Sequence, residues 1–513
     1  MYTLSTSLSS GSSSGRRNAR KPKGGGQQLS QIEEKAKSIV GENNVVADKV
    51  DRVAYARDLT PYFAIPDIVV LPQNSDQVVK ILRLASEHNI PVTPRGGGAS
   101  FQGSSLAVRG GLVLDLSRMN KILEISREDL VAVVQPGVRY ETFEHELERQ
   151  GLTFPHDVGS HDAATIGGIL ASDSNGHHAY KYGRVGSWIQ SMEVVLLDGR
   201  VLRLGTRAPR YNMGYNLSAL FAGSEGTLGI ITEATLRVIP RMPVFASIGA
   251  FFEDLDDLMA ASHEINMSGV DAGTLEATDG YTVKTINDVM DLGFPECEGN
   301  FVGDVEGFDE ENLQHKLRIM SRILEENNGK EVTVARDDAS IKRLWSPRLD
   351  IDIAICKVHP GYREIGFAAA DPCVPLSKMA EAMRKIGEII RDQGILAAVF
   401  CHTGIGIIHP AVLFNPNDSD HWHAMKRAEK EILEYVMDIG GAVTAEHGFG
   451  YVKNTYVRRA VGEEKLAIDR QIKEIFDPAG ILNPGKMGID SEERDDDVRF
   501  IFPAYVPDKE VEE

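Results

Sequence analysis

Three consecutive glycines, Gly96 to Gly98, constrain the fold of this chain more than any other feature of its sequence. They follow the β-rich run Ile90 to Thr93, so we expect a strand that leads directly into a loop. Consecutive glycines let main-chain N–H groups converge on an anion without obstruction by Cβ. From these residues alone, a phosphate cradle and a flexible turn remain equally good interpretations. The loop fits neither the Rossmann nor the Walker pattern.

Hydrophobic periodicity predicts an α+β fold. Apolar residues at helical spacing indicate a helix over residues 74–89, which Asn74 or Ser75 would cap. Short β-rich runs predict strands over 112–114, 131–134 and 192–197. Further helices are expected over residues 255–267, 311–326 and 376–393, alternating with short strands.

The chain has 513 residues, which is enough for several domains, since one domain takes roughly 100 to 200 residues. A Ser-, Gly- and Arg-rich stretch over 1–28 predicts a disordered tail, and the acidic stretch 491–513 a solvated one. Pro240-Arg241-Met242-Pro243 is typical of a linker, so we expect domains over 29–242 and 243–470. Residues 471–490 are expected to form a C-terminal segment that closes over the ligand site.

Charge and cysteine usage exclude several classes of function. The net charge of −20 would repel a phosphate backbone, so nucleic acid is not an expected partner. The four cysteines form no C-x-x-C pair, which argues against a disulfide framework, an iron–sulfur cluster or a zinc motif and favours a reducing compartment. No stretch reaches the roughly 18 uninterrupted apolar residues of a membrane span.

More glycine motifs follow the first one. They include Pro155-His156-Asp157-Val158-Gly159-Ser160, Thr165-Ile166-Gly167-Gly168, Asn175-Gly176, Tyr182-Gly183 and Gly223-Ser224-Glu225-Gly226-Thr227-Leu228-Gly229-Ile230. In this order they resemble the FAD-binding domain shared with vanillyl-alcohol oxidase. From about Val46 to Lys486 the chain is similar to the branch of D-lactate dehydrogenase, glycolate oxidase and D-2-hydroxyglutarate dehydrogenase. The resemblance implies a vanillyl-alcohol-oxidase-type (PCMH-type) FAD-binding domain and an α+β substrate or cap domain with a ferredoxin-like sheet.

The resemblance also implies which residues contact FAD. The pyrophosphate would lie in the first glycine turn and the turn at Thr165, and the flavin and adenosine portions along the other motifs. The implied contacts are Arg95, Gly96, Gly97, Gly98, Ala99, Ser100, Pro155, Asp157, Gly159, Ser160, Thr165, Gly167, Gly168, Asn175, Gly176, Glu225 and Ile230. Relatives that bond their flavin covalently use a His or Cys in the first loop. This loop has neither, so dissociable FAD is expected.

A second constellation combines His402, His409 and Glu446, which are the ligand types of a divalent transition metal. Seven residues along a strand would point the two imidazoles to opposite faces, so Gly404 or Gly406 must bend the backbone if both bind one ion. From the residues alone, the alternative remains that the two histidines are structural residues that form hydrogen bonds and bind no metal. The stretch resembles the family's His-x-Gly-Asp-Gly-Asn-x-His, and this resemblance implies that the three residues hold Zn, Mn or Fe.

The resemblance assigns two further roles. His447, in the family's Glu-His-Gly, would be the active-site base, and Arg348, in its Trp-x-x-Arg, would grip a substrate carboxylate. The chain departs from the family at Ile405 and Ile407, where Asp and Asn are usual, so metal affinity or substrate choice is expected to differ. A lysine found in some relatives is missing at Ala368 to Ala370, which argues against recognition of a second substrate carboxylate.

Together these features predict an FAD-dependent dehydrogenase that oxidises a D-2-hydroxy acid. Because the chain has no haem motif or cluster ligands, electrons would pass to an external acceptor: a quinone, a cytochrome, an electron-transferring flavoprotein or an iron–sulfur subunit. A homodimer or membership of a redox complex is expected, in the cytoplasm, at a membrane surface or in the mitochondrial matrix. The alternatives are a superfamily enzyme acting on a phenolic alcohol or an alkylglycerone phosphate, and a non-catalytic flavin subunit.

Overall fold

The computed structural model describes residues 25–364, 367–490 and 499–500. Of the tail expected over 1–28, residues 1–24 lie outside the described part, and helix α1 (Gly25–Val40) begins four residues before the expected boundary. The acidic stretch 491–513 lies outside it too, except for β20 (Arg499–Phe500), which pairs with β2 (Tyr62–Phe63).

The N-terminal part begins with a four-stranded sheet. Its order is β1 (Val45–Val46), β3 (Ile68–Val70), β5 (Leu112–Asp115) and β4 (Val92–Arg95), with β5 parallel to both of its neighbours. Helix α3 (Ser75–His88) packs on this sheet together with α1. The predicted helix over 74–89 is therefore confirmed, and its cap is Asn74, whose side chain accepts a 3.0 Å hydrogen bond from the N–H of Gln77.

A second, antiparallel sheet completes the N-terminal part. Its order is β10 (Val201–Gly205), β9 (Ile189–Val195), β11 (Ile230–Arg237), β7 (Val131–Val134) and β6 (Ile122–Ser126). Its buried face packs on helices α4 (Tyr140–Glu148) and α5 (Ile166–Ser172) around Phe143 and Phe154. The short elements α2 (Lys49–Arg52), β8 (Leu152–Thr153), α6 (Ala179–Tyr182), α7 (Ser218–Phe221) and β12 (Ile239–Pro240) connect these parts.

A seven-stranded antiparallel sheet forms the cap, which we define as residues 243–438. Its order is β16 (Lys330–Ala335), β13 (Val244–Phe252), β15 (Gly299–Gly307), β14 (Thr274–Asp279), β18 (Leu396–His402), β19 (Ile407–Phe414) and β17 (Arg363–Glu364). The elements β13, α8 (Leu255–Ser268), β14, β15, α10 (Glu310–Glu326) and β16 form the β-α-β-β-α-β unit of a ferredoxin-like fold, with strand order 4-1-3-2 and one further helix inserted between β14 and β15.

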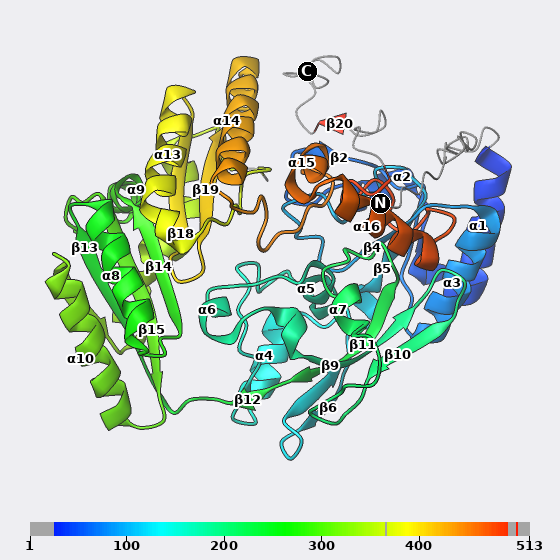
Figure 1. The fold of residues 1–513 in the computed structure, drawn as a ribbon. Coiled ribbons are helices and arrows are strands. Elements are labelled where there is room, and N and C mark those ends of the chain that lie inside the picture. Colours follow the sequence, from blue (N-terminus) through cyan, green and yellow to red (C-terminus); the bar gives the residue numbers. More distant parts are fainter. Residues whose placement is uncertain (1–24, 365–366, 491–498, 501–513) are drawn as a thin grey trace, which may run out of the picture.

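Helices cover both faces of the cap sheet (Figure 1). One face packs on α8, α10, α13 (Met379–Asp392) and α14 (Ser419–Asp438). The other packs on α9 (Gly280–Met290), α11 (Asp338–Leu349) and α12 (Ile351–Val358). Because side chains alternate along a strand, Glu276, Phe400, His402 and His409 share the second face, while Cys401 and Ile408 belong to the first.

After α14 the chain returns to the N-terminal part. Helices α15 (Val457–Val461) and α16 (Glu463–Phe476), which the sequence analysis grouped largely with the cap, lie beside that part (Figure 1). Beyond them, the main chain of Ile481 and Asn483 pairs with Val92 of β4, and Ile481 and Leu482 enter the core beneath the first sheet. Apolar burial thus fixes this segment on the domain that carries the glycine turns.

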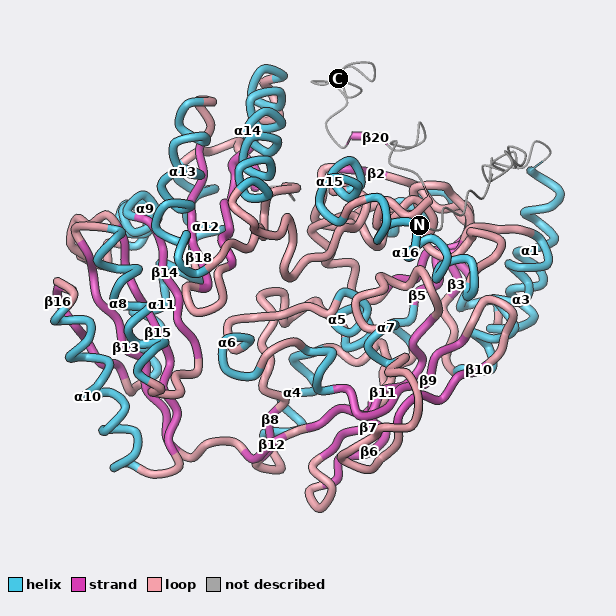
Figure 2. Tube along the Cα trace, viewed as in Figure 1, coloured by secondary structure: helices cyan, strands magenta, loops and turns pink. Residues whose placement is uncertain are grey.

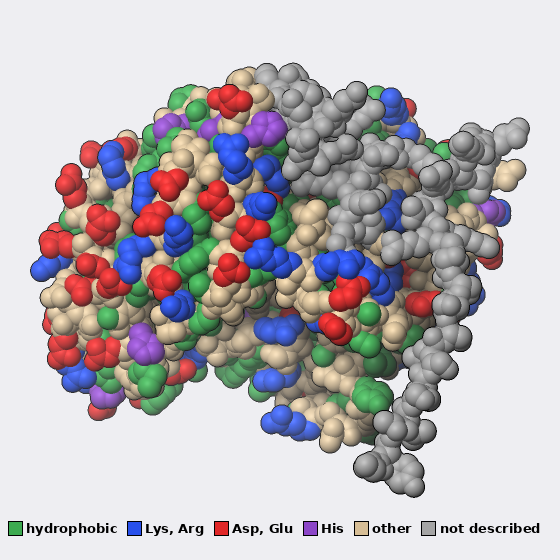
Figure 3. Space-filling view, turned by 45° about the horizontal axis from the view of Figure 1, so that its top comes forward, with side chains coloured by type: hydrophobic (Ala, Val, Ile, Leu, Met, Phe, Trp, Pro, Cys, Tyr) green, Lys and Arg blue, Asp and Glu red, His purple; other side chains and the backbone are tan. Residues whose placement is uncertain are grey.

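On the face in Figure 3, acidic and basic side chains of the described residues are interspersed over the cap. This agrees with the net charge of −20. Within the described residues, no helix combines the length and the apolar character that crossing a bilayer requires.

Candidate active site between the two parts

Loops of the N-terminal part face the cap in Figure 2. A cavity of about 510 Å³ is lined by residues from both of these parts. It joins the glycine turns to the histidine and glutamate constellation. The predicted site residues that line it are Arg95, Gly96, Gly97, Gly98, Ala99, Ser100, Gly159, Ser160, Thr165, Gly167, Gly168, Asn175, Gly176, Glu225, Ile230, Arg348, His402, His409, Glu446 and His447. Pro155 and Asp157 are not among the lining residues.

The first glycine turn packs closely against the turn before α5. A Cβ on Gly97 would lie 1.9 Å from the carbonyl oxygen of Ala163, and one on Gly96 would lie 2.2 Å from Oγ1 of Thr165. Only glycine allows this approach. Oγ1 of Thr165 and Oδ1 of Asn175 are buried polar atoms that have no hydrogen-bond partner in the described chain. They leave hydrogen-bonding capacity beside the turns, which fits a polar ligand such as the FAD dinucleotide.

Two of the expected FAD contacts have another role in this structure. The carboxylate of Asp157 faces His178, with Oδ1 3.1 Å from Nδ1 of that imidazole, and it also accepts the backbone N–H of His178. The carboxylate of Glu225 accepts the backbone N–H groups of Phe449 and Gly450 and the hydroxyl of Ser104. The carboxylate oxygens of Glu225 are thus occupied by protein donors. These hydrogen bonds connect Ser104, shortly after the first glycine turn, to the loop that follows Glu446.

The two predicted metal-binding histidines lie on neighbouring strands. β18 ends at His402, and β19 begins at Ile407, so residues 403–406 form a hairpin turn. Gly406 has φ of +85°, and a Cβ there would lie 2.3 Å from the carbonyl oxygen of Val374. The bend expected at Gly404 or Gly406 is thus a hairpin that brings both imidazoles to one face of the sheet.

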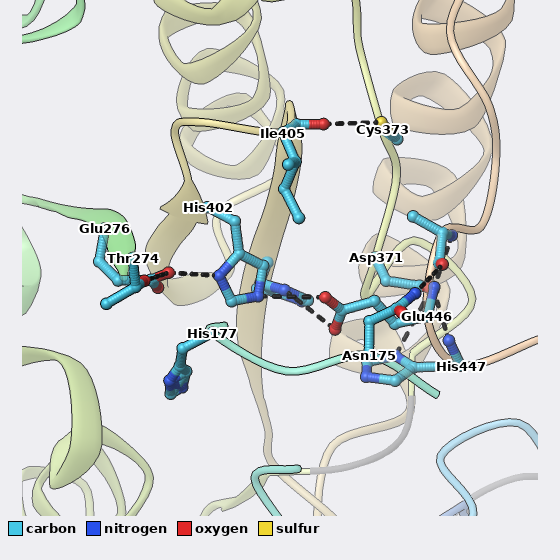
Figure 4. A network of polar contacts seen from close by, with 12 residues as sticks. Asn175, His177, Thr274, Glu276, Asp371, Cys373, His402, Ile405, Glu446 and His447 are labelled. Carbon is cyan, nitrogen blue, oxygen red and sulfur yellow. Dashed lines mark hydrogen bonds and ion pairs between the residues drawn. The ribbon is translucent and has the colours of Figure 1, made fainter. Parts of the chain in front are cut away.

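Glu446 completes the group from the loop after α14 (Figure 4). Its carboxylate oxygens lie 3.2 Å from Nε2 of His402 and 3.6 Å from Nε2 of His409, and one ligand atom from each residue falls within 4.8 Å of the others. Nε2 of His409 and Oε1 of Glu446 are buried and make no hydrogen bond within the described chain. Three buried N and O donors facing one point fit a divalent metal ion.

Protonation at this group follows from burial and charge. Burial lowers the pKa of His409 to about 3, so that this imidazole is neutral and its nitrogen lone pair is available. Burial would raise the pKa of Glu446, but the imidazole of His402 outweighs it and lowers this pKa to about 2. Burial would likewise lower the pKa of His402, which the carboxylates of Glu276 and Glu446 raise to about 10. The ionised carboxylate and the neutral His409 are the forms that bind metal.

Behind His402 lies Glu276, which the sequence analysis missed. It stands directly opposite His402 in the pairing of β14 with β18 and is fully buried. Its Oε1 lies 2.5 Å from Nδ1 of His402, and its Oε2 accepts a 2.9 Å bond from Nε of Arg348. The guanidinium of Arg348 lies 4.1 Å from the centre of the Phe400 ring. The sequence offered no clear signal, because β14 reads Thr-Leu-Glu-Ala-Thr-Asp and contains a second acid and two threonines.

His447 is held from two sides. The ring of Phe101, just beyond the first glycine turn, stacks on its imidazole with centroids 5.1 Å apart. The buried carboxylate of Asp371 accepts its backbone N–H at 2.8 Å and lies 3.6 Å from its Nδ1. Asp371 also pairs with the buried ammonium of Lys453, whose charge helps to hold the pKa of Asp371 well below its usual range against the effect of burial. The sequence analysis assigned no role to Phe101 or Asp371.

Two histidines to which the sequence analysis assigned no role lie at the same interface. His177 is buried, lines the cavity, and lies between the rings of Trp345 and His402 at centroid distances of 5.7 and 5.6 Å. His178 binds Asp157 as described above. Neither is an isolated surface residue. Their position directly after the Asn175-Gly176 motif is the sequence feature that could have predicted their place at this interface.

Ile405 and Ile407 do not line the cavity. Ile407 is buried in β19 opposite His402. The carbonyl oxygen of Ile405 lies 3.4 Å from the thiol of Cys373, which donates to it (Figure 4). The departure from the family pattern therefore replaces polar groups beside the histidines by apolar packing.

The halves match known families. Residues 66–205 match the family described as FAD binding domain, and residues 241–487 match the family described as FAD linked oxidases, C-terminal domain. Glycolate oxidase subunit GlcD of Bacillus subtilis (strain 168) is 32% identical over 457 residues, which cover 89% of this chain and 96% of that protein. The mitochondrial D-lactate dehydrogenase (cytochrome) of Arabidopsis thaliana is 32% identical over 454 residues, covering 87% and 78%.

Solved structures share the fold. p-Cresol methylhydroxylase with substrate bound gives a TM-score of 0.75 at 19% identity, covering 91% of this chain and 98% of that one. 4-Ethylphenol oxidase from Gulosibacter chungangensis gives 0.76 at 20%, with the same coverage. The expected vanillyl-alcohol-oxidase-type (PCMH-type) fold is confirmed, and the protein is a flavoprotein with an FAD-binding domain and a cap. The chain belongs to the FAD-linked oxidase family. It is an FAD-dependent oxidoreductase related to glycolate oxidase and D-lactate dehydrogenase.

Proposed function

We propose that this protein oxidises a D-2-hydroxy acid of the D-lactate or glycolate type to the 2-oxo acid. The observation that carries the proposal is the single cavity that places the glycine turns, the buried group of His402, His409 and Glu446, the imidazole of His447 and the guanidinium of Arg348 around one space. Oxidation of a 2-hydroxy acid requires four features that this cavity could provide. They are an oxidant, a binding site for the substrate hydroxyl, a base that takes its proton, and a cation that binds the substrate carboxylate.

The residues of the chain divide this work. Arg348 binds the substrate carboxylate, and His447 takes the proton of the hydroxyl while the C–H pair leaves the α-carbon as hydride, so that the C–O bond becomes a carbonyl. FAD, when bound, supplies the oxidant that accepts the hydride, and a divalent ion held by His402, His409 and Glu446 supplies a Lewis acid for the hydroxyl. Phe101 and Asp371 orient the base, and the surrounding apolar side chains exclude water.

The relatives support the substrate class, because two of them are named for glycolate and D-lactate. The buried histidine and glutamate group supports it over a phenolic or alkylglycerone phosphate substrate, whose oxidation or transfer does not require such a metal. We expect dissociable FAD, since neither His nor Cys occurs at residues 95–100. Electrons would leave to an external acceptor, either a small molecule or a partner subunit.

An anaerobic titration tests the substrate class. The FAD-loaded protein is mixed with D-lactate, glycolate and longer D-2-hydroxy acids, with L-lactate as the matched control, and the oxidised flavin absorbance is followed. We expect at least one D-acid or glycolate to bleach the flavin and L-lactate to leave it unchanged. If every acid leaves it oxidised, the proposal is wrong, and a non-catalytic flavin subunit takes its place.

A second measurement tests the assigned base. His447→Asn should retain FAD and metal, each near one per chain, but reduce its flavin at least about 100-fold more slowly, because general-base catalysis contributes that much. Flavin reduction at the native rate in this variant would exclude His447 as the base. Metal content far below one per chain in the native protein would exclude the Lewis-acid assignment.

A further inference from the structure

We infer that Glu276 is a positioning residue shared by two parts of the substrate site: it orients His402 toward the metal group and Arg348 toward the substrate carboxylate. The inference rests on the proposed function and adds to it a residue that touches neither substrate nor flavin. Glu276 is fully buried in the middle of the cap sheet, and each of its carboxylate oxygens faces one of the two partners. Figure 4 shows its contact with His402.

On the metal side, Glu276 selects which nitrogen of His402 is available. Oε1 lies 2.5 Å from Nδ1, so the proton of a neutral imidazole is held on that nitrogen. Nε2, which lies 3.2 Å from a carboxylate oxygen of Glu446, is then the nitrogen that would give its lone pair to a metal ion. A carboxylate behind a ligating histidine fixes its tautomer and raises its basicity. Thr274 donates a 3.0 Å bond to the same oxygen and keeps the carboxylate in place.

On the substrate side, Glu276 takes only one donor of Arg348. Oε2 accepts the bond from Nε, while Nη1 and Nη2 have no hydrogen-bond partner among the described residues. Phe400 lies against the guanidinium plane. These two contacts set the position and tilt of the Arg348 guanidinium. Nη1 and Nη2 are left to bind a substrate carboxylate in the cavity, which Arg348 lines.

The sheet register explains why one residue can serve both partners. Glu276 and His402 are directly opposite across β14 and β18, and Phe400 and His409 are directly opposite across β18 and β19. All four side chains therefore stand on the same face, under the last turn of α11 that carries Arg348. Backbone hydrogen bonds between the strands set the distances of Glu276 from His402 and His409, and the packing of α11 on the sheet places Arg348 beside them.

Glu276→Gln tests the inference. An amide has a single acceptor oxygen, so it cannot accept from both partners, although its shape is the same. The first readout is the dissociation constant of Mn²⁺ or Zn²⁺ from the FAD-loaded protein, which we expect to rise about 10- to 100-fold. The second is the dissociation constant of pyruvate, read from flavin absorbance in chelator-treated protein, which we expect to rise about 10-fold because Arg348 loses its orientation.

Two control variants separate positioning from general disturbance. Phe400→Leu removes the ring beside Arg348 and should weaken pyruvate binding while leaving the metal dissociation constant unchanged. Asp304→Asn alters another buried carboxylate of the same sheet, bound to Ser247 and Trp345, and should leave both constants within twofold. Glu276→Asp, a shorter carboxylate that cannot reach both partners, replaces the amide variant if that variant does not fold.

The outcomes separate this inference from the proposed function. If the native protein binds metal and pyruvate and both Glu276 variants bind them within twofold of the native constants, the inference is overturned and the proposed function stands. If the native protein binds neither, the proposed function fails. A rise in both constants for the Glu276 variants, with the metal constant unaffected in Phe400→Leu, supports the shared role.

Discussion

The imidazole of His447 stacks on the ring of Phe101, with centroids 5.1 Å apart and planes inclined by 27°. Phe101 follows the first glycine turn, and His447 follows Glu446, the proposed metal ligand, in the loop after the cap. One contact thus joins the turn that would hold FAD to the residue proposed as base. Because both residues line the cavity, the position of the base depends on how the two halves meet.

Phe101→Leu should lower kcat by about 10- to 100-fold, because a base displaced by a fraction of an ångström loses its alignment with the hydroxyl. FAD and metal content should stay unchanged, since Phe101 binds neither group through a polar atom. Phe101→Tyr keeps the stacked ring and is the matched control, with kcat expected near native. Steady-state kinetics with the best acid from the titration provides the measurement. A native kcat in Phe101→Leu would show that stacking does not hold the base.

Asp371→Asn should destabilise the protein by about 3–5 kcal/mol, because it leaves the ammonium of Lys453 buried without its carboxylate partner. The amide also provides a weaker acceptor for the N–H groups of residues 445–447. Glu381→Gln, which breaks the exposed pair with Lys378, is the control and should cost no more than about 1 kcal/mol. Urea denaturation of the FAD-loaded proteins compares the two. Equal midpoints for both variants would contradict the assignment.

The pair of His178 and Asp157 predicts a loss of stability at alkaline pH. Burial lowers the pKa of His178, but the carboxylate of Asp157 outweighs this and raises it to about 9, against about 6.5 in the unfolded chain. The pair therefore stabilises the fold fully below pH 6.5. Between pH 6.5 and 9 the unfolded state releases its proton first, so the contribution falls by up to about 1.4 kcal/mol per pH unit, and it is gone above pH 9.

Thermal unfolding between pH 6 and 9.5 measures this dependence. The Tm of Asp157→Asn should fall less steeply than that of the native protein across this window. His145→Asn, which changes an exposed histidine of α4, should follow the native curve. Parallel curves for Asp157→Asn and the native protein would show that the pair does not titrate as described.

Gly97→Ala should reduce bound FAD at least about tenfold. Its Cβ would lie 1.9 Å from the carbonyl oxygen of Ala163, so one of the two turns must move away from the position where it faces the cavity. Gly387→Ala is the matched control, because that glycine lies in α13 and its Cβ would meet only the flexible end of Arg391. The ratio of flavin to protein absorbance after purification gives the result. Full occupancy in Gly97→Ala would mean that the turn tolerates a side chain and does not cradle the cofactor.

Local sequence patterns predicted the elements of the fold well. The helix capped by Asn74 and the strand before the first glycine turn follow from capping and β propensity, which act over a few residues. The packing of α16 against the second core of the N-terminal part could not be predicted in this way, because the helical pattern of a segment does not say which core buries its apolar face.

The candidate site divides in the same way. His402, His409, Glu446, His447 and the glycine turns stand in short motifs, so their residue types and spacing could be recognised in the chain. The bend between the histidines followed from strand geometry and from Gly406. The expected FAD contacts of Asp157 and Glu225 illustrate the limit, since their motif placed them near the cavity but their carboxylates are occupied by protein donors.

Local stereochemical preferences of the residues determine where this chain forms turns, helices and strands. The sequence also determines which side chains with metal-binding or acid–base chemistry the chain carries. The partners of those side chains depend on contacts between distant segments. Glu276 meets His402 across 126 positions because two strands pair in one register, and Phe101 meets His447 because the loop after the cap returns to the N-terminal part. Such contacts arise from the packing of whole sheets and domains, and no window of the sequence contains both members of either pair.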